Sequence, residues 1–332
     1  MTRPTRRPRR RAIGLLLATV IVVPGACGPT LPVTPAPSAS PTPALASPSP
    51  TATASTSGQP VETATWTPVQ PAGGPPAARD GHSWTTDPSS AVAYLFGGRG
   101  AAGELDDLWV YDMTADAWQQ LSPTGARPTA RYDHAAAWID GLGLVVAGGR
   151  SASGVLADLW AYDPSANDWR TLDTTGPVPA GRSGACSALR TDGSWWMYGG
   201  AGADGAGLAE LWQYDSGRSA WVETTVDAGP LGRLDAACWW TNDGRFDVYG
   251  GRPRTDGPPV TDGAIWSLDP ALISAAQAWS SVAGPAGPDR ARAAITSNGD
   301  AAVVVGGLGA DGAPRSDLVV VGPDGATLLG PG

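Results

Sequence analysis

The chain has few of the basic residues from which nucleic-acid sites are built. It contains no lysine, so arginine supplies all 22 basic residues against 31 acids, and the formal net charge is −9. Six of these arginines lie within the first eleven residues, which leaves 16 arginines against 31 acids in the remainder. Binding of nucleic acid needs a basic surface that neutralises phosphates. We therefore expect no nucleic-acid partner.

Candidate metal ligands are equally scarce. There are only two histidines, His82 and His134, and each lies three residues after an arginine. One repeated sequence position explains both better than a shared metal does. Asp-Gly pairs such as Asp204-Gly205 are typical of turns, because they lack the alternating acids of a calcium loop. No clear nucleophile with a neighbouring base stands out either, so the sequence predicts no metal, no cofactor and no catalytic residue.

No apolar run near the N-terminus is long enough to span a bilayer. Residues 12–23 form an apolar run of twelve that follows the six arginines, and small residues then precede Cys27. A bilayer span needs about 20 residues. We expect residues 1–27 to be an export signal, and the protein to be extracytoplasmic.

This signal resembles that of bacterial lipoproteins, in which the cysteine is lipidated and becomes the first residue of the mature chain. The resemblance implies lipidation at Cys27 and contact with a membrane only through that lipid anchor. Pro24 stands where the pattern usually has leucine. The alternative is a signal that is retained or cleaved elsewhere, with Cys27 discarded and the protein secreted.

Residues 28–61 contain no charged residue and consist largely of Pro, Ser, Thr and Ala. Such a segment cannot bury enough apolar area to offset its chain entropy. In polyproline II form, at about 3.1 Å per residue, it could reach roughly 100 Å. We expect a disordered stalk here, followed by a folded head over residues 62–332.

The head repeats one sequence pattern. Gly pairs begin at residues 97, 148, 199, 250 and 306, so three intervals are 51 residues long and the last is 56. Each unit opens with an arginine, and units one to four close with a tryptophan. The opening arginines are Arg79, Arg131, Arg182, Arg233 and Arg290, and the closing tryptophans are Trp118, Trp169, Trp221 and Trp279. A period of about 50 residues indicates a repeat architecture.

Arginine, an apolar run into Gly-Gly, then Leu-Trp-x-Tyr-Asp and a closing tryptophan resemble the kelch repeat. The resemblance covers about residues 64–330 and weakens in units four and five, which lack Tyr-Asp. It implies an all-β fold, a kelch-type propeller of about five four-stranded blades around a channel, preceded by the stalk. The recurrent aromatic residues are then expected to pack between blades. A sixth blade would require a unit with no visible motif.

Unit five has no closing tryptophan, so the repeat pattern does not identify the strand that completes the fifth blade. Trp66 stands 13 residues before Arg79, which is also the spacing from Trp118 to Arg131. We therefore expect the strand at Thr65–Val69 to fill the fourth place of the fifth blade. The rival closure uses the shorter segment Ala326–Leu329.

The five opening arginines are the best candidates for ligand-binding residues. One per blade at the same position should form a ring near the mouth of the channel, and guanidinium groups bind carboxylates through two donors. In kelch binding domains the motif's arginines can line the peptide-binding face, so the resemblance implies an anionic ligand. The alternative is that each arginine pairs with an acid or a carbonyl of its own blade. A second set is expected to form salt bridges between loops: Arg99, Arg150 and Arg252 with Asp107, Asp158 and Glu210.

Two cysteines fall inside the repeats. Cys186 and Cys238 follow their opening arginines by four and five residues. We therefore expect them in neighbouring inner strands with opposite facing, as small buried residues. A disulfide between them is possible in an exported protein, but it is doubtful with that geometry.

Two functions fit this chain. The first is a surface-tethered or secreted binding module for a protein or glycan ligand, without catalysis of its own. The second is an exported sugar enzyme similar to kelch-type sialic acid mutarotases, which would use channel arginines and an acid. The fold alone does not decide between them.

Overall fold

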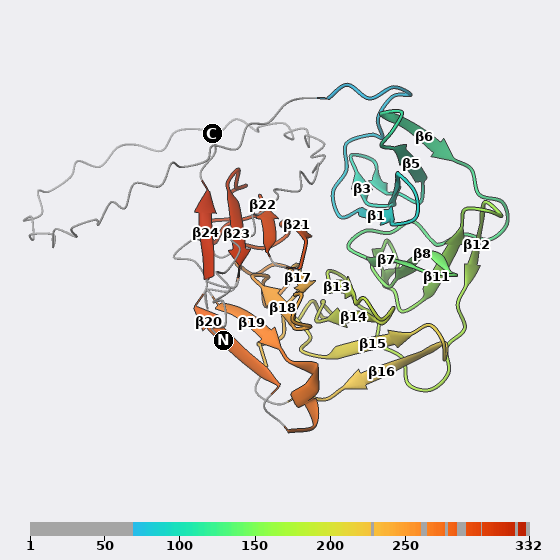
Figure 1. The fold of residues 1–332 in the computed structure, drawn as a ribbon. Helices are drawn as coiled ribbons and strands as arrows, with labels where there is room; N and C mark the ends of the chain where they lie inside the picture. The colour runs from blue at the N-terminus through green and yellow to red at the C-terminus, as the bar shows by residue number, and fades with distance from the viewer. Residues whose placement is uncertain are drawn as a thin grey trace, which may run out of the picture.

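The structure is a computed structural model that describes residues 69–226, 229–259, 264–275, 278–283, 290–299, 301–322 and 325–329. The predicted signal, Cys27, the stalk and residues 65–68 lie outside this part of the chain. Five four-stranded antiparallel sheets lie side by side around a common centre (Figure 1). This confirms the all-β propeller of five blades.

Each blade takes its four strands from one sequence unit, in chain order from the centre outward. Blade one has β1 (Ser83–Asp87), β2 (Val92–Phe96), β5 (Leu108–Asp112) and β6 (Ala117–Leu121), and blade two has β7 (Ala135–Ile139), β8 (Gly143–Ala147), β11 (Leu159–Asp163) and β12 (Asp168–Thr171). Blade three has β13 (Cys186–Leu189), β14 (Trp195–Tyr198), β15 (Leu211–Asp215) and β16 (Ala220–Thr224). Blade four has β17 (Ala237–Trp240), β18 (Phe246–Tyr249), β19 (Ala264–Leu268) and β20 (Trp279–Ala283), and blade five has β21 (Ala294–Ser297), β22 (Ala302–Val305), β23 (Leu318–Gly322) and β24 (Gly325–Leu329).

Shorter elements connect these strands. Two-stranded ribbons, β3 (Arg99–Gly100) with β4 (Gly103–Glu104) and β9 (Arg150–Ser151) with β10 (Gly154–Val155), follow the Gly pairs of blades one and two. Blade four carries a short 3-10 helix, Pro270–Ala275. Within the described ranges, no helix is both long enough and apolar enough to cross a membrane.

In blades one to four the second strand is the most buried. All five residues of β8 are buried, as are all four of β14 and β18. A strand covered by neighbouring blades on both faces needs a continuous apolar run, and the sequence before each Gly pair supplies it. The outer strands differ: β6 buries only Trp118 fully and exposes two glutamines.

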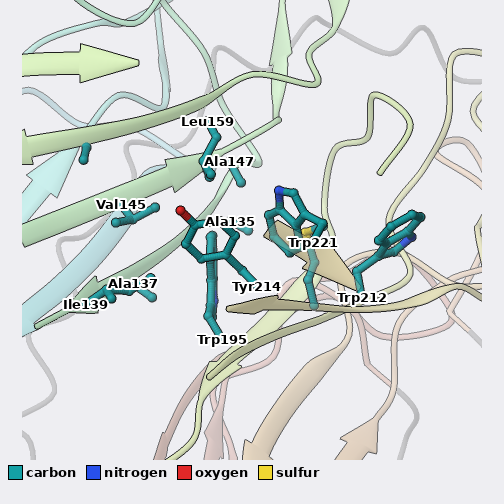
Figure 2. Close-up of a cluster of buried hydrophobic side chains, with 12 residues drawn as sticks. Ala135, Ala137, Ile139, Val145, Ala147, Leu159, Trp195, Trp212, Tyr214 and Trp221 are labelled. Carbon is teal, nitrogen blue, oxygen red and sulfur yellow. The ribbon is translucent and has the colours of Figure 1, made fainter. Parts of the chain in front are cut away.

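Apolar clusters join consecutive blades. Between blades two and three, Val145, Ala147 and Leu159 pack with Trp195 and Trp221 (Figure 2). In blades two to four the closing tryptophan faces the preceding blade. The Trp169 ring, for example, lies 4.9 Å from that of Phe96 in blade one. Buried aromatic pairs of this kind add to the energy of area burial, and the expectation that the repeated aromatics pack between blades is confirmed.

The preferred closure of the ring is wrong. The fourth strand of blade five is β24, which pairs with β23 in the register Leu318↔Leu329, so the rival segment near the C-terminus takes this place. Because β24 begins three residues after β23 ends, forming this pair costs little loop-closure entropy. Near the N-terminal end of the described chain, Ala72 instead forms an isolated parallel bridge with Ala117, the first residue of β6.

The side of blade one that faces away from blade two is the least covered. The cluster there contains Leu95, Tyr111 and Trp118 with Trp109, all from blade one. Trp84 lies over Tyr111 and Trp118 and is 40% exposed. Among the described residues, the seam between blades five and one therefore lacks the shared apolar cluster that joins the other neighbours.

Candidate functional site

One face of the propeller carries the repeated motif. In each antiparallel blade the first and third strands begin at this face, and the second and fourth strands end there. The opening arginines, the Gly pairs and the connectors between blades therefore gather on it, and we call it the motif face. The turns that join the first strand to the second, such as the one at Asp140, and the third strand to the fourth lie on the opposite face.

Arg131 shows how the repeated arginine is used. Its side chain is fully buried and forms two 2.7 Å bonds to the two carboxylate oxygens of Asp158. It also donates from Nε to the Thr129 carbonyl and from Nη1 to the Gly148 carbonyl, both at 2.9 Å. One guanidinium thus joins the incoming connector, the Gly pair and the third strand of its blade.

The other arginines repeat this pattern. Arg79 binds Asp107 through two nitrogens and the Gly97 carbonyl through one. The remaining pairs are Arg182 with Glu210 and Gly199, Arg290 with Asp317 and Gly306, and Arg233 with the Leu231 and Gly250 carbonyls.

The arginine ring is therefore buried. Four of its members are only 0–3% exposed: Arg131, Arg182, Arg233 and Arg290. This agrees with the alternative interpretation, in which each arginine pairs within its own blade. Burial would raise the pKa of Asp158, but the hydrogen bonds and charge of Arg131 outweigh it and hold that pKa below its ordinary value. Direct ligand binding by these arginines stays a prediction, and a ligand would have to displace their acids.

The expected salt bridges between loops are partly wrong. Asp107, Asp158 and Glu210 pair with the opening arginines. Arg99 instead lies 3.6 Å from Asp80, and Arg252 lies 2.6 Å from Asp235. The acids that precede Leu-Trp enter the blade beside the opening arginine, where burial favours a bidentate pair.

A second ring lies two residues after the opening arginines. Backbone N–H groups donate across each blade boundary, from Asp133 to Gly81, from Gly184 to Asp133 and from Asp235 to Gly184 at 2.7 Å, and from Arg292 to Asp235 at 2.9 Å. All five residues have φ between 52° and 68°. This left-handed conformation favours glycine and tolerates aspartate, which fits the residues of units one to four.

Arg292 departs from that composition. Its guanidinium reaches Asp133 of blade two at 2.9 Å and Asp80 of blade one at 3.5 Å. Burial raises the pKa of Asp133 to about 6, although the charge of Arg292 acts in the opposite direction. The side chain of Arg292 thus ties blade five to the two blades beyond the poorly covered seam.

The two histidines lie inside the blades, next to this ring. His134 is 9% exposed, and its Nε2 lies 2.9 Å from Ser83 Oγ of blade one. Burial, with the Arg131 charge, lowers the pKa of His134 to about 3, so the ring is neutral. Within the described ranges, no three His, Cys, Asp or Glu side chains are placed to hold a metal ion.

The motif face also has a groove between blades two and three, with a volume of about 290 Å³. It is lined by residues 157–159 and 171–174, together with Val178 and the buried Trp221. Asp173 lies at the rim, is exposed, and follows β12. Two of its lining residues, Leu159 and Trp221, also belong to the apolar cluster of Figure 2.

The connector before blade three leaves this groove open. In the connector before blade four, Gly229 lies so close to the closing tryptophan that a Cβ added to it would come within 2.7 Å of Trp279 Nε1. The equivalent residue at the groove, four before the opening arginine, is Val178, which is 50% exposed. We call the space over Trp221 the Trp221 groove.

Sequence reasoning missed the Trp221 groove. The signal available was the connector Thr174–Ala180, in which two prolines flank an exposed valine. The proposed lipidation residue, Cys27, lies outside the described residues.

Comparison with known proteins finds the same repeats. Residues 59–251 match the KLHDC2/KLHL20/DRC7 Kelch-repeats domain. Serine/threonine-protein phosphatase BSL2 of Arabidopsis thaliana is 30% identical over 279 residues, which cover 77% of this chain and 27% of that protein. Acyl-CoA-binding domain-containing protein 4 of Arabidopsis thaliana is 31% identical over 53% of this chain and 25% of its own length.

A shorter similarity extends to an animal protein. Kelch domain-containing protein 3 of Bos taurus is 30% identical over 39% of this chain and 36% of its own length. This chain thus spans between 25% and 36% of the length of these three relatives. Their printed names differ in activity, so what the similarity shows is the shared repeat domain.

Proposed function

The chain belongs to the KLHDC2/KLHL20/DRC7 kelch-repeats family, and from this premise we propose that it is a protein-binding module without catalysis of its own. The observation that carries the proposal is the Trp221 groove, an open hollow of about 290 Å³ on the motif face, lined by both polar and apolar residues. Binding pockets combine apolar side chains with polar groups that orient the ligand.

The charges of the groove indicate the chemistry of the partner. Asp173 is exposed, and the side chain of Asp158 is 35% exposed. None of the described residues that line the groove is basic. Since the accessible charge is negative, we propose that the groove receives an apolar side chain of a partner protein, next to a Lys or Arg that meets Asp173.

This partner has the opposite charge from the anionic ligand that the arginine ring suggested. The anionic ligand and the glycan both remain competing predictions. The sugar-enzyme alternative would use channel arginines, and the contacts described for the opening arginines bind them within their own blades. No specific observation favours that alternative.

We propose further that the propeller is exported and held at a surface through Cys27 and the stalk. The lipoprotein-like signal and the uncharged composition of residues 28–61 support this. Replacing Cys27 by Ser should abolish labelling with an alkyne fatty acid and move the protein from the membrane to the soluble fraction. A wild-type protein that takes up no label would contradict lipidation.

Site-specific photo-crosslinking tests the binding function. The full chain would carry a benzophenone amino acid at Val178, in the groove, or at Asp140, on the opposite face as a matched control. We expect a protein adduct from position 178 whose cross-linked peptide contains an apolar residue next to Lys or Arg.

The other outcomes each count against part of the proposal. Adducts only from position 140 would place binding on the other face. An acidic cross-linked peptide at 178 would favour the anionic ligand, and a glycan adduct would favour the sugar. No adduct at either position would contradict the binding module.

A further inference from the structure

Two thiols meet at the interface between blades three and four. Cys186 lies in β13 and Cys238 in β17, the innermost strands of these blades, and they are 7% and 5% exposed. Both belong to the apolar cluster that joins the two blades, together with Tyr198, Val248 and other residues. The expectation that they face opposite ways in their own blades is confirmed, since Cys186 points toward blade four and Cys238 toward blade three, but this facing brings them together across the boundary instead of separating them.

The two side chains are also in contact. Both are free cysteines, and the Cys186 thiol lies close enough to add to the effect of burial in raising the pKa of Cys238. The one-residue offset between their positions in the repeat brings them together, because successive residues of a strand point to opposite faces, so that Cys186 points toward blade four and Cys238 toward blade three. Two thiols that face each other from adjacent inner strands are in the arrangement from which an S–S bond of about 2.05 Å can form.

The geometry points to a disulfide between Cys186 and Cys238 that covalently joins blades three and four when the protein folds in an oxidising compartment. Each thiol loses one proton and one electron as the S–S bond forms. The two electrons pass to the disulfide of a thiol–disulfide oxidoreductase or of oxidised glutathione, which is reduced to two thiols. The inference is independent of the ligand of the Trp221 groove.

Burial decides when this bond can form. Burial, with the neighbouring thiol, raises the pKa of Cys238, and the thiolate is the species that attacks a disulfide. The folded, reduced protein should therefore oxidise slowly, and the bond should form during folding. Once formed, it is shielded from reductants by the same cluster.

Other blade boundaries lack such a pair. At the equivalent positions, blades two and three have Ala135 and Ser187, and blades four and five have Ala237 and Ile295. The cross-link is thus specific to one boundary. It would close a loop between residues 52 apart in sequence, a length at which a disulfide constrains the unfolded chain strongly.

Oxidative refolding tests the proposal. The full chain with Cys27→Ser, which removes the third cysteine, would be refolded in a glutathione redox buffer and compared with the same chain refolded in excess reductant. We expect the oxidised product to lose about 2 Da and both titratable thiols. We also expect it to melt higher by on the order of 5 °C.

The control variant is Cys27→Ser with Cys238→Ser, which should show neither the mass change nor the shift in melting temperature. Two free thiols after refolding under oxidising conditions would overturn the proposal, as would glutathione adducts in place of the internal bond. A second variant adds cysteines and therefore keeps the proposal testable if the loss of Cys238 prevents folding. Ala135→Cys with Ser187→Cys places a cysteine pair at the equivalent positions of blades two and three, and this pair should form a second disulfide if the positions in the repeat bring the thiols together.

Discussion

Replacing Arg131 by Ala should destabilise the propeller without acting through a binding surface. The substitution removes the two 2.7 Å bonds to Asp158 and the bonds to the Thr129 and Gly148 carbonyls. Breaking a buried ion pair by deleting one partner costs about 3–5 kcal/mol, because the other charge stays behind. Since the side chain of Asp158 is 35% exposed, water would offset part of that cost, and we expect a loss of about 3 kcal/mol.

Urea unfolding of the wild type and the variant measures this loss, and Arg127→Ala is the matched control. Arg127 is 58% exposed and lies 3.3 Å from Asp106, so its removal should cost less than about 1 kcal/mol. Arg131→Lys keeps the charge but not the fork of donors, and it should fall close to the alanine variant. An Arg131→Ala protein as stable as Arg127→Ala, but unable to bind its partner, would refute the structural role of the arginine ring.

Two further predictions concern the centre of the propeller. The pKa of Asp133 is raised to about 6, so this group contributes stability that is present at acid pH and is lost as the pH rises through that value. His134 behaves in the opposite way: its pKa is lowered to about 3, so it contributes stability that is lost as the pH falls below 6.5. In the Asp133→Asn variant, the free energy of unfolding should therefore fall more steeply as the pH is lowered from 6 to 4, by up to about 1.4 kcal/mol per pH unit. Urea unfolding at a series of pH values measures this, and a pH dependence equal to that of the wild type would contradict it. Arg292→Gly introduces the residue found at this position in units one and three and removes the ion pairs to Asp80 and Asp133. Amide hydrogen exchange in β21 and β22 should become at least several-fold faster, while exchange in β7 and β8 stays unchanged. An equal change in all four strands would show that Arg292 does not hold the seam.

The repeat period predicted the blades because each strand is defined by residues close to it in sequence. The five Gly pairs and the apolar runs before them located the second strands of all blades. The pairing of Arg131 with Asp158 was also readable, since the opening arginine and an acid recur 27 or 28 residues apart in the units of Arg79, Arg131, Arg182 and Arg290. Distances along one blade follow from the repeat.

Features that depend on contact between blades were harder to predict. The spacing of Trp66 favoured the wrong closing strand, because β24 competes for the same edge and lies much nearer to β23 in sequence. The opposite facing of Cys186 and Cys238 followed from one-residue alternation, but their contact did not, because it depends on the two blades being neighbours that turn these faces toward each other. The Trp221 groove depends on how far the connector at Val178 lies from Trp221 of the next blade, and the sequence of the connector does not give that distance directly.

The most direct test of the account is a hydrogen-exchange footprint of the full chain with and without the partner segment identified by photo-crosslinking. The account predicts slower exchange in residues 157–159 and 171–180, which border the Trp221 groove, and a loss of this protection in Asp173→Lys but not in Asp140→Lys. Protection confined to the turns of the opposite face, or protection at the groove that Asp173→Lys leaves unchanged, would contradict it.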